Sequence, residues 1–338
     1  MKIWKFLAVP GLAVAAAVIA AGAAYAIPPA DIEARLIALG RVVDAPGTTA
    51  IYGPILKNQS FDGVTFVRNI TYDAGPRALL DVATPSKHAP RPLPVLIYVP
   101  GGGGNKRLDY VGGEPFYDNI ALVAVRKGMI PVIMQRQATP GWDSGAKDIS
   151  TVIQWVHENI ERYGGDPRRI VIWGQSAGSN ALSVYLGHKQ FWGPDGVGVK
   201  AAVEMSGGYN LLPLEPKSVN SARGPGDGGA AAIAAAQRNL AANNAEPPPV
   251  DLAVQLQRST LPGFKALKIK MFVTAAELDP ERTMETAYML RDVLCKAGNC
   301  PGFMISKGES HISEVQSINT DDKEVETPLF AWMKDALQ

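Results

Sequence analysis

The sequence predicts an α/β fold in which a mostly parallel sheet is covered by helices on both faces. Short apolar runs typical of buried strands alternate with longer segments of helical periodicity through most of the chain. This alternation indicates a parallel sheet, because parallel strands are joined by crossover helices. The chain of 338 residues is 46% hydrophobic, enough for one large domain or two small ones, and it shows no internal repeat.

The strands are expected where apolar residues run between Gly, Asp and Pro. Two early runs, 64–70 and 77–82, predict antiparallel strands at the start of the sheet. The later runs are more continuously apolar and predict buried strands at 94–99, 130–134, 170–173, 200–205, 269–274 and 302–306.

Helices are expected in the intervening segments. The clearest has apolar residues at spacings of three and four from Ile149 to Ile160, and Asp148 before them is the predicted N-cap. The other predicted helices span residues 31–41, 117–127, 177–186, 283–297 and 328–337.

Residues 212–263 interrupt this alternation. They include an alanine-rich predicted helix at 230–242, three successive prolines at 247–249 and several glycines. The segment is too long for a simple crossover and too weakly apolar for a domain of its own. We interpret it as an insertion over the carboxyl edge of the sheet, a lid or substrate wall. A surface insertion without that role is the alternative. Residues 27–338 are otherwise predicted to form a single domain.

The first 26 residues are predicted to be a cleaved signal peptide. Two lysines within the first five residues precede an apolar run at 6–23, and Ala-Tyr-Ala at 24–26 is a small-x-small cleavage site. A retained membrane anchor is the alternative, because the apolar run is nearly long enough to span a bilayer. Pro10 and Gly11 within the run favour cleavage. The mature chain is then expected to be periplasmic or secreted, without a stable membrane span.

Cys295 and Cys300 are the only cysteines in the sequence. In an oxidising compartment, a local disulfide between a helix end and the next strand is expected. Two unpaired thiols are the alternative. No histidine or second cysteine pair lies near them in the sequence, so a zinc site is not predicted.

The segment Gly174-Gln-Ser176-Ala-Gly178 follows the apolar run at 170–173 and precedes a helix-favouring segment. Strand, sharp turn and helix are the context that a nucleophile elbow requires. Small residues must flank the serine, because strand and helix approach each other closely there. The helix start also places backbone N–H groups and positive dipole charge beside the serine. Ser176 is therefore the candidate nucleophile.

A serine nucleophile needs an adjacent base, and the base needs a carboxylate that orients it. Of the four histidines, only His311 lies on a late loop after a predicted strand. Glu277 and Asp279 follow the strand predicted at 269–274, and so satisfy the order Ser…Asp/Glu…His. We favour Asp279 as the acid and expect Glu277 to cap the following helix.

The tetrahedral intermediate of acyl transfer needs hydrogen-bond donors for its developing negative charge. Gly102 and Gly103 follow a buried strand and can offer backbone N–H groups without side-chain obstruction. The N–H of Ala177, directly after the serine, is the expected partner donor. A phosphate-binding role for this glycine run is excluded by its spacing, which fits neither a P-loop nor a dinucleotide-binding motif.

The chain resembles the α/β-hydrolases of the esterase/lipase group over roughly residue 77 to the C-terminus. Within that group it is similar to hormone-sensitive-lipase-like and type-B carboxylesterases, and to bacterial feruloyl- and acetyl-xylan-esterase-like hydrolases. The matching segments are Pro100-Gly-Gly-Gly, Tyr163-Gly-Gly-Asp-Pro-Arg-Arg, Gly174-Gln-Ser-Ala-Gly178, Ala276-Glu-Leu-Asp-Pro280 and Ser310-His-Ile-Ser-Glu314.

This resemblance implies an α/β-hydrolase fold with Ser176 as nucleophile, Asp279 as acid and His311 as base. It also implies that the chemistry uses no metal and no organic cofactor. The sequence departs from the family pattern at Pro100, which replaces the histidine of the family's His-Gly-Gly-Gly. The departure leaves open which glycines form the oxyanion hole.

We therefore expect an exported serine hydrolase that cleaves carboxylic esters of small molecules or polymers through an acyl-enzyme on Ser176. Amide cleavage by the same residues is the first alternative, and a hydrolase fold used only for binding is the second. A net charge of +1 without a basic stripe gives no indication of nucleic-acid binding.

Overall fold

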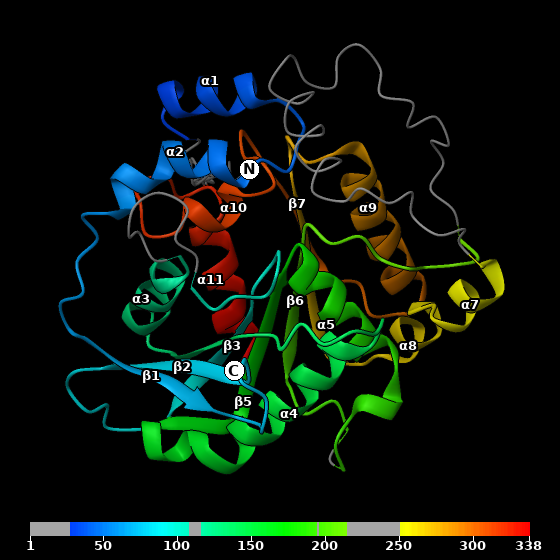
Figure 1. Ribbon diagram of the computed structural model, residues 1–338, viewed down its shortest axis with the longest axis horizontal. Helices are drawn as coiled ribbons and strands as arrows, with labels where there is room; N and C mark the ends of the chain where they lie inside the picture. The colour runs from blue at the N-terminus through cyan, green and yellow to red at the C-terminus, as the bar shows by residue number, and fades with distance from the viewer. Residues whose placement is uncertain (1–27, 108–115, 195, 215–250) are drawn as a thin grey trace, which may run out of the picture.

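Eight strands form a single sheet in the part of the chain that the computed structural model describes, residues 28–107, 116–194, 196–214 and 251–338 (Figure 1). They are β1 (Val64–Thr71), β2 (Leu79–Pro85), β3 (Leu93–Val99), β4 (Ile130–Met134), β5 (Gly165–Gln175), β6 (Ala201–Met205), β7 (Lys270–Ala276) and β8 (Gly302–Ser306). Their order is β1-β2-β4-β3-β5-β6-β7-β8. Strand β2 is antiparallel to β1 and β4, and the neighbours from β4 to β8 are parallel. The predicted mostly parallel sheet is therefore confirmed.

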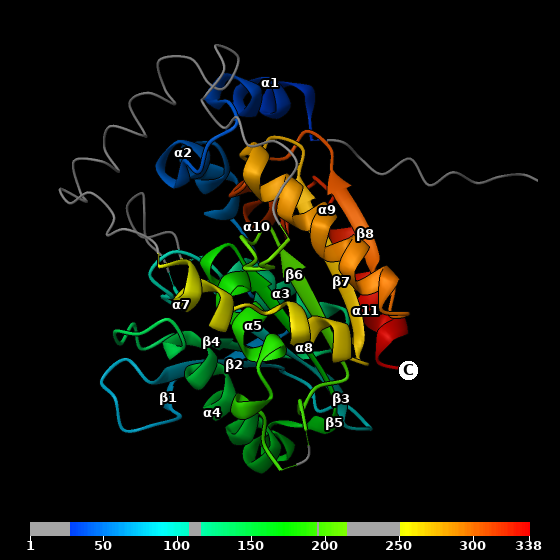
Figure 2. The same ribbon diagram turned by 90° about the vertical axis from the view of Figure 1, so that its right-hand side faces the viewer.

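Helices cover both faces of the sheet, which Figure 1 shows close to edge-on. One face is covered by α4 (Ser144–Asn159), α5 (Ala177–Gly187), α8 (Leu261–Ala266) and α9 (Glu281–Lys296). The other is covered by α3 (Asp118–Arg126) and α11 (Glu326–Ala336). Helices α1 (Ala30–Leu39) and α2 (Ala45–Leu56) contribute side chains to the same core cluster and lie together at the top of Figure 1. Shorter helical segments are η1 (Ile160–Tyr163), η2 (Lys189–Phe191), α7 (Leu252–Gln257) and α10 (Ser313–Gln316). Figure 2 views the molecule from the side of α5 and α9.

The core has two layers because successive side chains of a strand point to opposite faces of the sheet. In β3, Val95, Ile97 and Val99 pack in the cluster that includes α5 and α9, whereas Leu96 and Tyr98 pack in the cluster that includes α3 and α11. All five side chains are fully buried. Burial on both faces explains why the sequence of β3 is continuously apolar rather than alternating.

The parallel strands all end at one edge of the sheet, so the loops after their carboxyl ends meet there. Those loops begin with Pro100 after β3, Ser176 after β5 and Ser206 after β6. The loops after β7 and β8 carry Asp279 and His311. Backbone hydrogen bonds join neighbouring loops: Ser176 N donates to the Met205 carbonyl at 2.9 Å, and Ser206 N donates to the Thr274 carbonyl at 2.8 Å.

The prediction that Asp148 caps α4 is wrong. The helix begins four residues earlier, at Ser144, and the buried Asp148 accepts a hydrogen bond from Gln137 N at 2.8 Å. A side chain at Gly145 would approach the Ala181 Cβ to 2.6 Å. This glycine therefore lets the first turn of α4 lie directly against α5, which the apolar periodicity alone does not indicate.

Helix α2 was not predicted, because Pro46, Gly47, Gly53 and Pro54 obscure its periodicity. Its start is stabilised by Asp44, which accepts a hydrogen bond from Gly47 N at 3.0 Å, and Pro46 suits the first turn of a helix. Tertiary contacts hold the rest of α2. Tyr52 Oη donates to Asp322 at 3.2 Å, and Gln316 Nε2 donates to Thr49 at 2.7 Å.

The ends of the predicted insertion are described, and they lie beside α5. Thr260 N donates to the Asn210 carbonyl at 2.9 Å, and a side chain at Gly263 would overlap the Gly187 carbonyl oxygen at 2.0 Å. Residues 215–250, including the predicted alanine-rich helix, lie outside the described residues, so the lid stays a prediction. The predicted signal peptide, 1–26, lies outside them as well.

The predicted disulfide is confirmed. Cys295 in the last turn of α9 is bonded to Cys300 just before β8, as expected for a link between a helix end and the next strand. None of the helices within the described ranges is long and apolar enough to cross a membrane.

Candidate active site

Ser176 lies in a sharp turn between β5 and α5, with φ of 55° and ψ of −124°. A non-glycine residue at positive φ is strained, and such strain is characteristic of functional turns. Both flanking glycines are required by close contacts. A Cβ at Gly174 would lie 2.8 Å from the Gly178 carbonyl oxygen, and one at Gly178 would lie 2.1 Å from the Val99 carbonyl oxygen. The expected turn geometry is therefore present.

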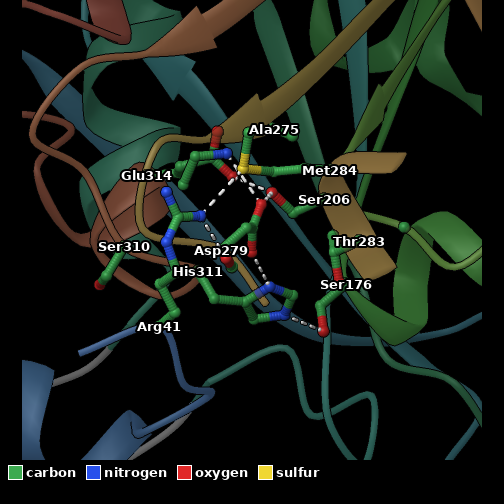
Figure 3. Close-up of polar contacts among 12 residues, drawn as sticks. Arg41, Ser176, Ser206, Ala275, Asp279, Thr283, Met284, Ser310, His311 and Glu314 are labelled. Carbon is green, nitrogen blue, oxygen red and sulfur yellow. Dashed lines mark hydrogen bonds and ion pairs between the residues drawn. The ribbon is translucent and has the colours of Figure 1, made fainter. Parts of the chain in front are cut away.

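His311 lies between Ser176 and Asp279 (Figure 3). Its Nε2 is 2.7 Å from Ser176 Oγ, and its Nδ1 is 2.6 Å from Asp279 Oδ1. Asp279 is fully buried, and its Oδ2 accepts hydrogen bonds from Ala276 N at 2.8 Å and from Ser206 Oγ at 2.6 Å. The structure thus brings together the three side chains that the sequence nominates.

Two opposing effects act on the pKa of His311. Burial of the imidazole lowers this pKa, but the charge of Asp279 and the hydrogen bond to it raise it by more. The pKa of His311 therefore lies above its ordinary value. The imidazole is thus a stronger base than a solvated histidine, and its protonated form is stabilised by Asp279.

Glu277, the other candidate acid, does not take part in these contacts. Its Oε2 accepts a hydrogen bond from Gly308 N at 2.8 Å, so it ties the loop after β7 to the loop after β8. The prediction that it caps α9 is wrong, because that helix begins at Glu281 after Pro280, without a side-chain cap. Asp279 lies two residues nearer to α9 than Glu277 does, and Asp279 is the carboxylate that contacts His311.

The glycine loop after β3 lies against Ser176. A Cβ on Gly101 would be 3.1 Å from the Ser176 Cβ, and Gly102 has a φ of 50°. Among the described residues, the backbone N–H groups of Gly102, Gly103 and Ala177 donate no hydrogen bond. Donors left free beside a strained serine are what an oxyanion site requires.

Two arginines hold this loop from its outer side. Arg136 Nη2 donates to the Gly102 carbonyl at 2.7 Å, and Arg77 Nη2 donates to the Gly103 carbonyl at 2.9 Å. Arg136 N also donates to the Gly104 carbonyl at 2.9 Å. In a planar peptide the carbonyl and the next N–H point in opposite directions. Fixing the Gly102 carbonyl therefore fixes the direction of the Gly103 N–H, in a loop where Pro100 replaces the family's histidine.

Arg136→Met should lower kcat for ester hydrolysis about 10-fold with little change in KM, the size expected for one charge-assisted hydrogen bond. The methionine keeps most of the stem but cannot orient the Gly102 carbonyl. Steady-state kinetics measure the effect, and Arg168→Met is the control, because that side chain is 87% exposed at the opposite end of β5. Equal kinetics for the two variants would show that the contact does not orient the loop.

Sequence reasoning missed several residues that surround the site. Ser206 could have been found, because it follows β6, which lies between the strands carrying Ser176 and Asp279. Glu314 lies three residues after His311, but nothing in the sequence shows that it points back to Ser206. Arg41 Nη1 donates to the Asp279 carbonyl at 3.1 Å from far away in the chain, and no local signal predicts that contact.

Comparison with known proteins finds sequence similarity around Ser176. Residues 79–212 match the carboxylesterase family, a segment that contains Ser176 but neither Asp279 nor His311. The chain is 34% identical over 118 residues to liver carboxylesterase of Sus scrofa, covering 32% of this chain and 20% of that protein. It is 34% identical over 137 residues to chlorogenic acid esterase of Aspergillus niger, covering 37% and 25%. The similarity thus spans only a fifth to a quarter of the length of these relatives.

The similarity of fold extends over nearly the whole chain. A structure from a study of two fungal esterases of Rhizomucor miehei superposes with a TM-score of 0.64 at 18% identity, covering 91% of this chain and 97% of that one. At 18% identity this structural similarity shows the fold alone. The family match shows that the segment around Ser176 is similar in sequence to carboxylesterases. Together, the sheet order, the strained serine turn and these similarities show an α/β-hydrolase fold whose residues 79–212 are similar to the carboxylesterase family.

Proposed function

We propose that this chain is a serine esterase that cleaves carboxylic esters through a covalent acyl-enzyme on Ser176. The observation that carries the proposal is the continuous hydrogen-bonded series from Ser176 through His311 to Asp279, with contacts of 2.7 and 2.6 Å. A serine hydroxyl is a weak nucleophile unless an adjacent base accepts its proton. The carboxylesterase match around the same serine supports an ester as the substrate.

In this mechanism, Ser176 Oγ attacks the ester carbonyl while His311 Nε2 accepts its proton. Asp279 holds the Nδ1–H tautomer and stabilises the imidazolium that forms. The N–H groups of Gly102, Gly103 and Ala177 are the candidate donors to the oxyanion. His311 then protonates the leaving alcohol, and water, activated by the same histidine, releases the acid from Ser176.

The test is hydrolysis of a series of p-nitrophenyl esters, from acetate to long acyl chains, by the mature protein. We expect turnover, and its dependence on acyl length will describe the acyl site. If no ester is cleaved but Ser176 reacts with a fluorophosphonate, amide or polymer substrates become the next candidates. If neither occurs, the esterase proposal fails, and a binding role for the fold becomes the better hypothesis.

We also propose that the chain is exported. The n-region, the apolar run and the small-x-small site at 24–26 support this, as does the Cys295–Cys300 disulfide, which is typical of oxidising compartments. Amino-terminal sequencing of the expressed protein should begin at Ile27. A membrane-bound product beginning at Met1 would indicate a retained anchor instead.

A further inference from the structure

Ser206 Oγ lies between two buried carboxyl groups. It is 2.6 Å from Asp279 Oδ2 and also in close contact with Glu314 Oε2. Both carboxyl groups have an exposed fraction of zero, and Ser206 itself is 2% exposed. Figure 3 shows the three side chains together, above His311 in that view. The proposed mechanism uses Asp279 but gives no role to Glu314.

The single hydroxyl proton of Ser206 limits how many of the two carboxyl groups, Asp279 and Glu314, can be ionised. A serine hydroxyl has one hydrogen, so it can donate to only one of the two carboxyl groups. If both were ionised, the second contact would join two electron-rich oxygens without a proton between them, away from water, which is costly. One of the two carboxyl groups must therefore carry a proton and donate it to Ser206.

The remaining contacts decide which group carries this proton. Asp279 also accepts hydrogen bonds from Ala276 N at 2.8 Å and from His311 Nδ1 at 2.6 Å, and N–H donors favour an ionised carboxylate. The other oxygen of Glu314, Oε1, accepts hydrogen bonds from Ser306 Oγ at 2.7 Å and Thr274 Oγ1 at 3.4 Å. With a proton on Oε2, every polar atom of this group has a compatible partner.

We propose that Glu314 is a neutral carboxylic acid that donates its proton to Ser206, so that Ser206 donates in turn to Asp279. Glu314 is then a positioning residue, which acts on the proposed active site through Ser206 and Asp279 without touching the substrate. The complete series of donors runs from Glu314 through Ser206 to Asp279 on one side, and from Ser176 through His311 to Asp279 on the other. This inference rests on the proposed function only for its effect on catalysis.

The charges around Glu314 favour this arrangement at neutral pH. Burial raises the pKa of Glu314 to about 8, and the negative charge of Asp279 adds to the rise. The hydrogen bonds from Ser206 and Ser306 and the charge of His311 oppose it. The titratable groups that interact with Glu314 are Asp279, His311, Glu309, Tyr98 and Tyr209. Above this pKa, Ser206 lies between two carboxylates and has only one proton to donate. Asp279 then no longer has a hydrogen-bond donor of its own in Ser206, and the negative charge of Glu314 repels it.

The first test needs no substrate. In protein labelled with ¹³C at the glutamate carboxyl carbons, the signal that is missing from Glu314→Gln is assigned to Glu314. We expect this signal to titrate with a midpoint near pH 8. A signal that already has the shift of a carboxylate at pH 6 would overturn the assignment of the proton.

The second test measures kcat/KM for an ester against pH. Glu314→Ala should lower kcat/KM at pH 7 about 10-fold, and Glu314→Gln should restore it, because the amide donates to Ser206 as the neutral acid does. Wild type should lose activity above pH 8, whereas Glu314→Gln should not. Because Glu314 acts through Ser206, Ser206→Ala with Glu314→Ala should be no slower than Ser206→Ala alone.

A Glu314→Gln variant as slow as Glu314→Ala would show that the negative charge is needed, and would overturn the proposal. Identical pH profiles for wild type and Glu314→Gln would also overturn it. If wild type cleaves no ester at any pH, the proposed function fails, and the carboxyl titration alone then decides where the proton resides.

Discussion

Ser176→Ala is expected to lower kcat/KM for p-nitrophenyl esters by about 10⁴-fold or more, because loss of the nucleophile removes the acyl-enzyme route entirely. The residual rate reflects substrate binding and oxyanion donors alone. Alanine removes only one side-chain hydrogen bond, because Ser176 Oγ has His311 as its sole hydrogen-bond partner among the described residues. Initial rates at saturating and limiting ester concentrations measure the effect.

The matched control for this variant is Ser183→Ala. Ser183 lies on the same helix and is buried, but its hydroxyl donates to the Asn180 carbonyl rather than to His311. We expect it to stay within about 3-fold of wild type, as for the loss of one neutral hydrogen bond outside the site. A Ser176→Ala variant with more than a tenth of wild-type activity would contradict the assigned nucleophile.

Asp279→Asn is expected to lower kcat/KM by about 10³–10⁴-fold, because a neutral amide can hold His311 in the wrong tautomer and cannot stabilise its protonated form. The matched control is Glu277→Gln, two residues away, whose carboxylate accepts only a backbone hydrogen bond from Gly308 in the part of the chain that the structure describes. We expect the control to retain activity within about 3-fold. A larger loss for Glu277→Gln than for Asp279→Asn would reverse the assignment of the acid.

Asp279→Asn and Glu277→Gln should also differ in how kcat/KM depends on pH. His311 acts as a base only when neutral, so kcat/KM falls as pH drops below its pKa. Asp279 raises the pKa of His311, so this acidic limb lies above the ordinary pKa of histidine in wild type. Removing the charge should move the limb of Asp279→Asn to lower pH, and leave that of Glu277→Gln in place. A pH series of kcat/KM shows the difference.

Local patterns in the sequence were sufficient to predict the mostly parallel sheet and to predict that Ser176, Asp279 and His311 lie close together. Each of these residues follows a continuously apolar run, and parallel strands end at one edge, so their loops had to meet. The order serine, acid, histidine then selected His311 among the four histidines. The roles of these residues in catalysis stay predictions.

The features that sequence reasoning missed depend on contacts between distant segments. The helix of residues 45–56 contains two prolines and two glycines, and it is held by contacts to Gln316 at the end of α10 and to Asp322 in the loop that follows. Glu314 reaches Ser206 only because β6, β7 and β8 are aligned in register. Arg136 reaches the Gly102 carbonyl because β4 lies beside β3, and strand order is not visible in a single sequence.

The central claim is that Ser176 forms a covalent bond during catalysis, and reaction with a fluorophosphonate tests it most directly. Ser176 Oγ should displace fluoride from phosphorus, and digestion followed by mass spectrometry should find the adduct on the peptide that contains Ser176. Ester hydrolysis should be lost in proportion to labelling, and Ser176→Ala should not react. An active protein whose label lies on another residue, or that stays active when Ser176 is fully labelled, would contradict the account.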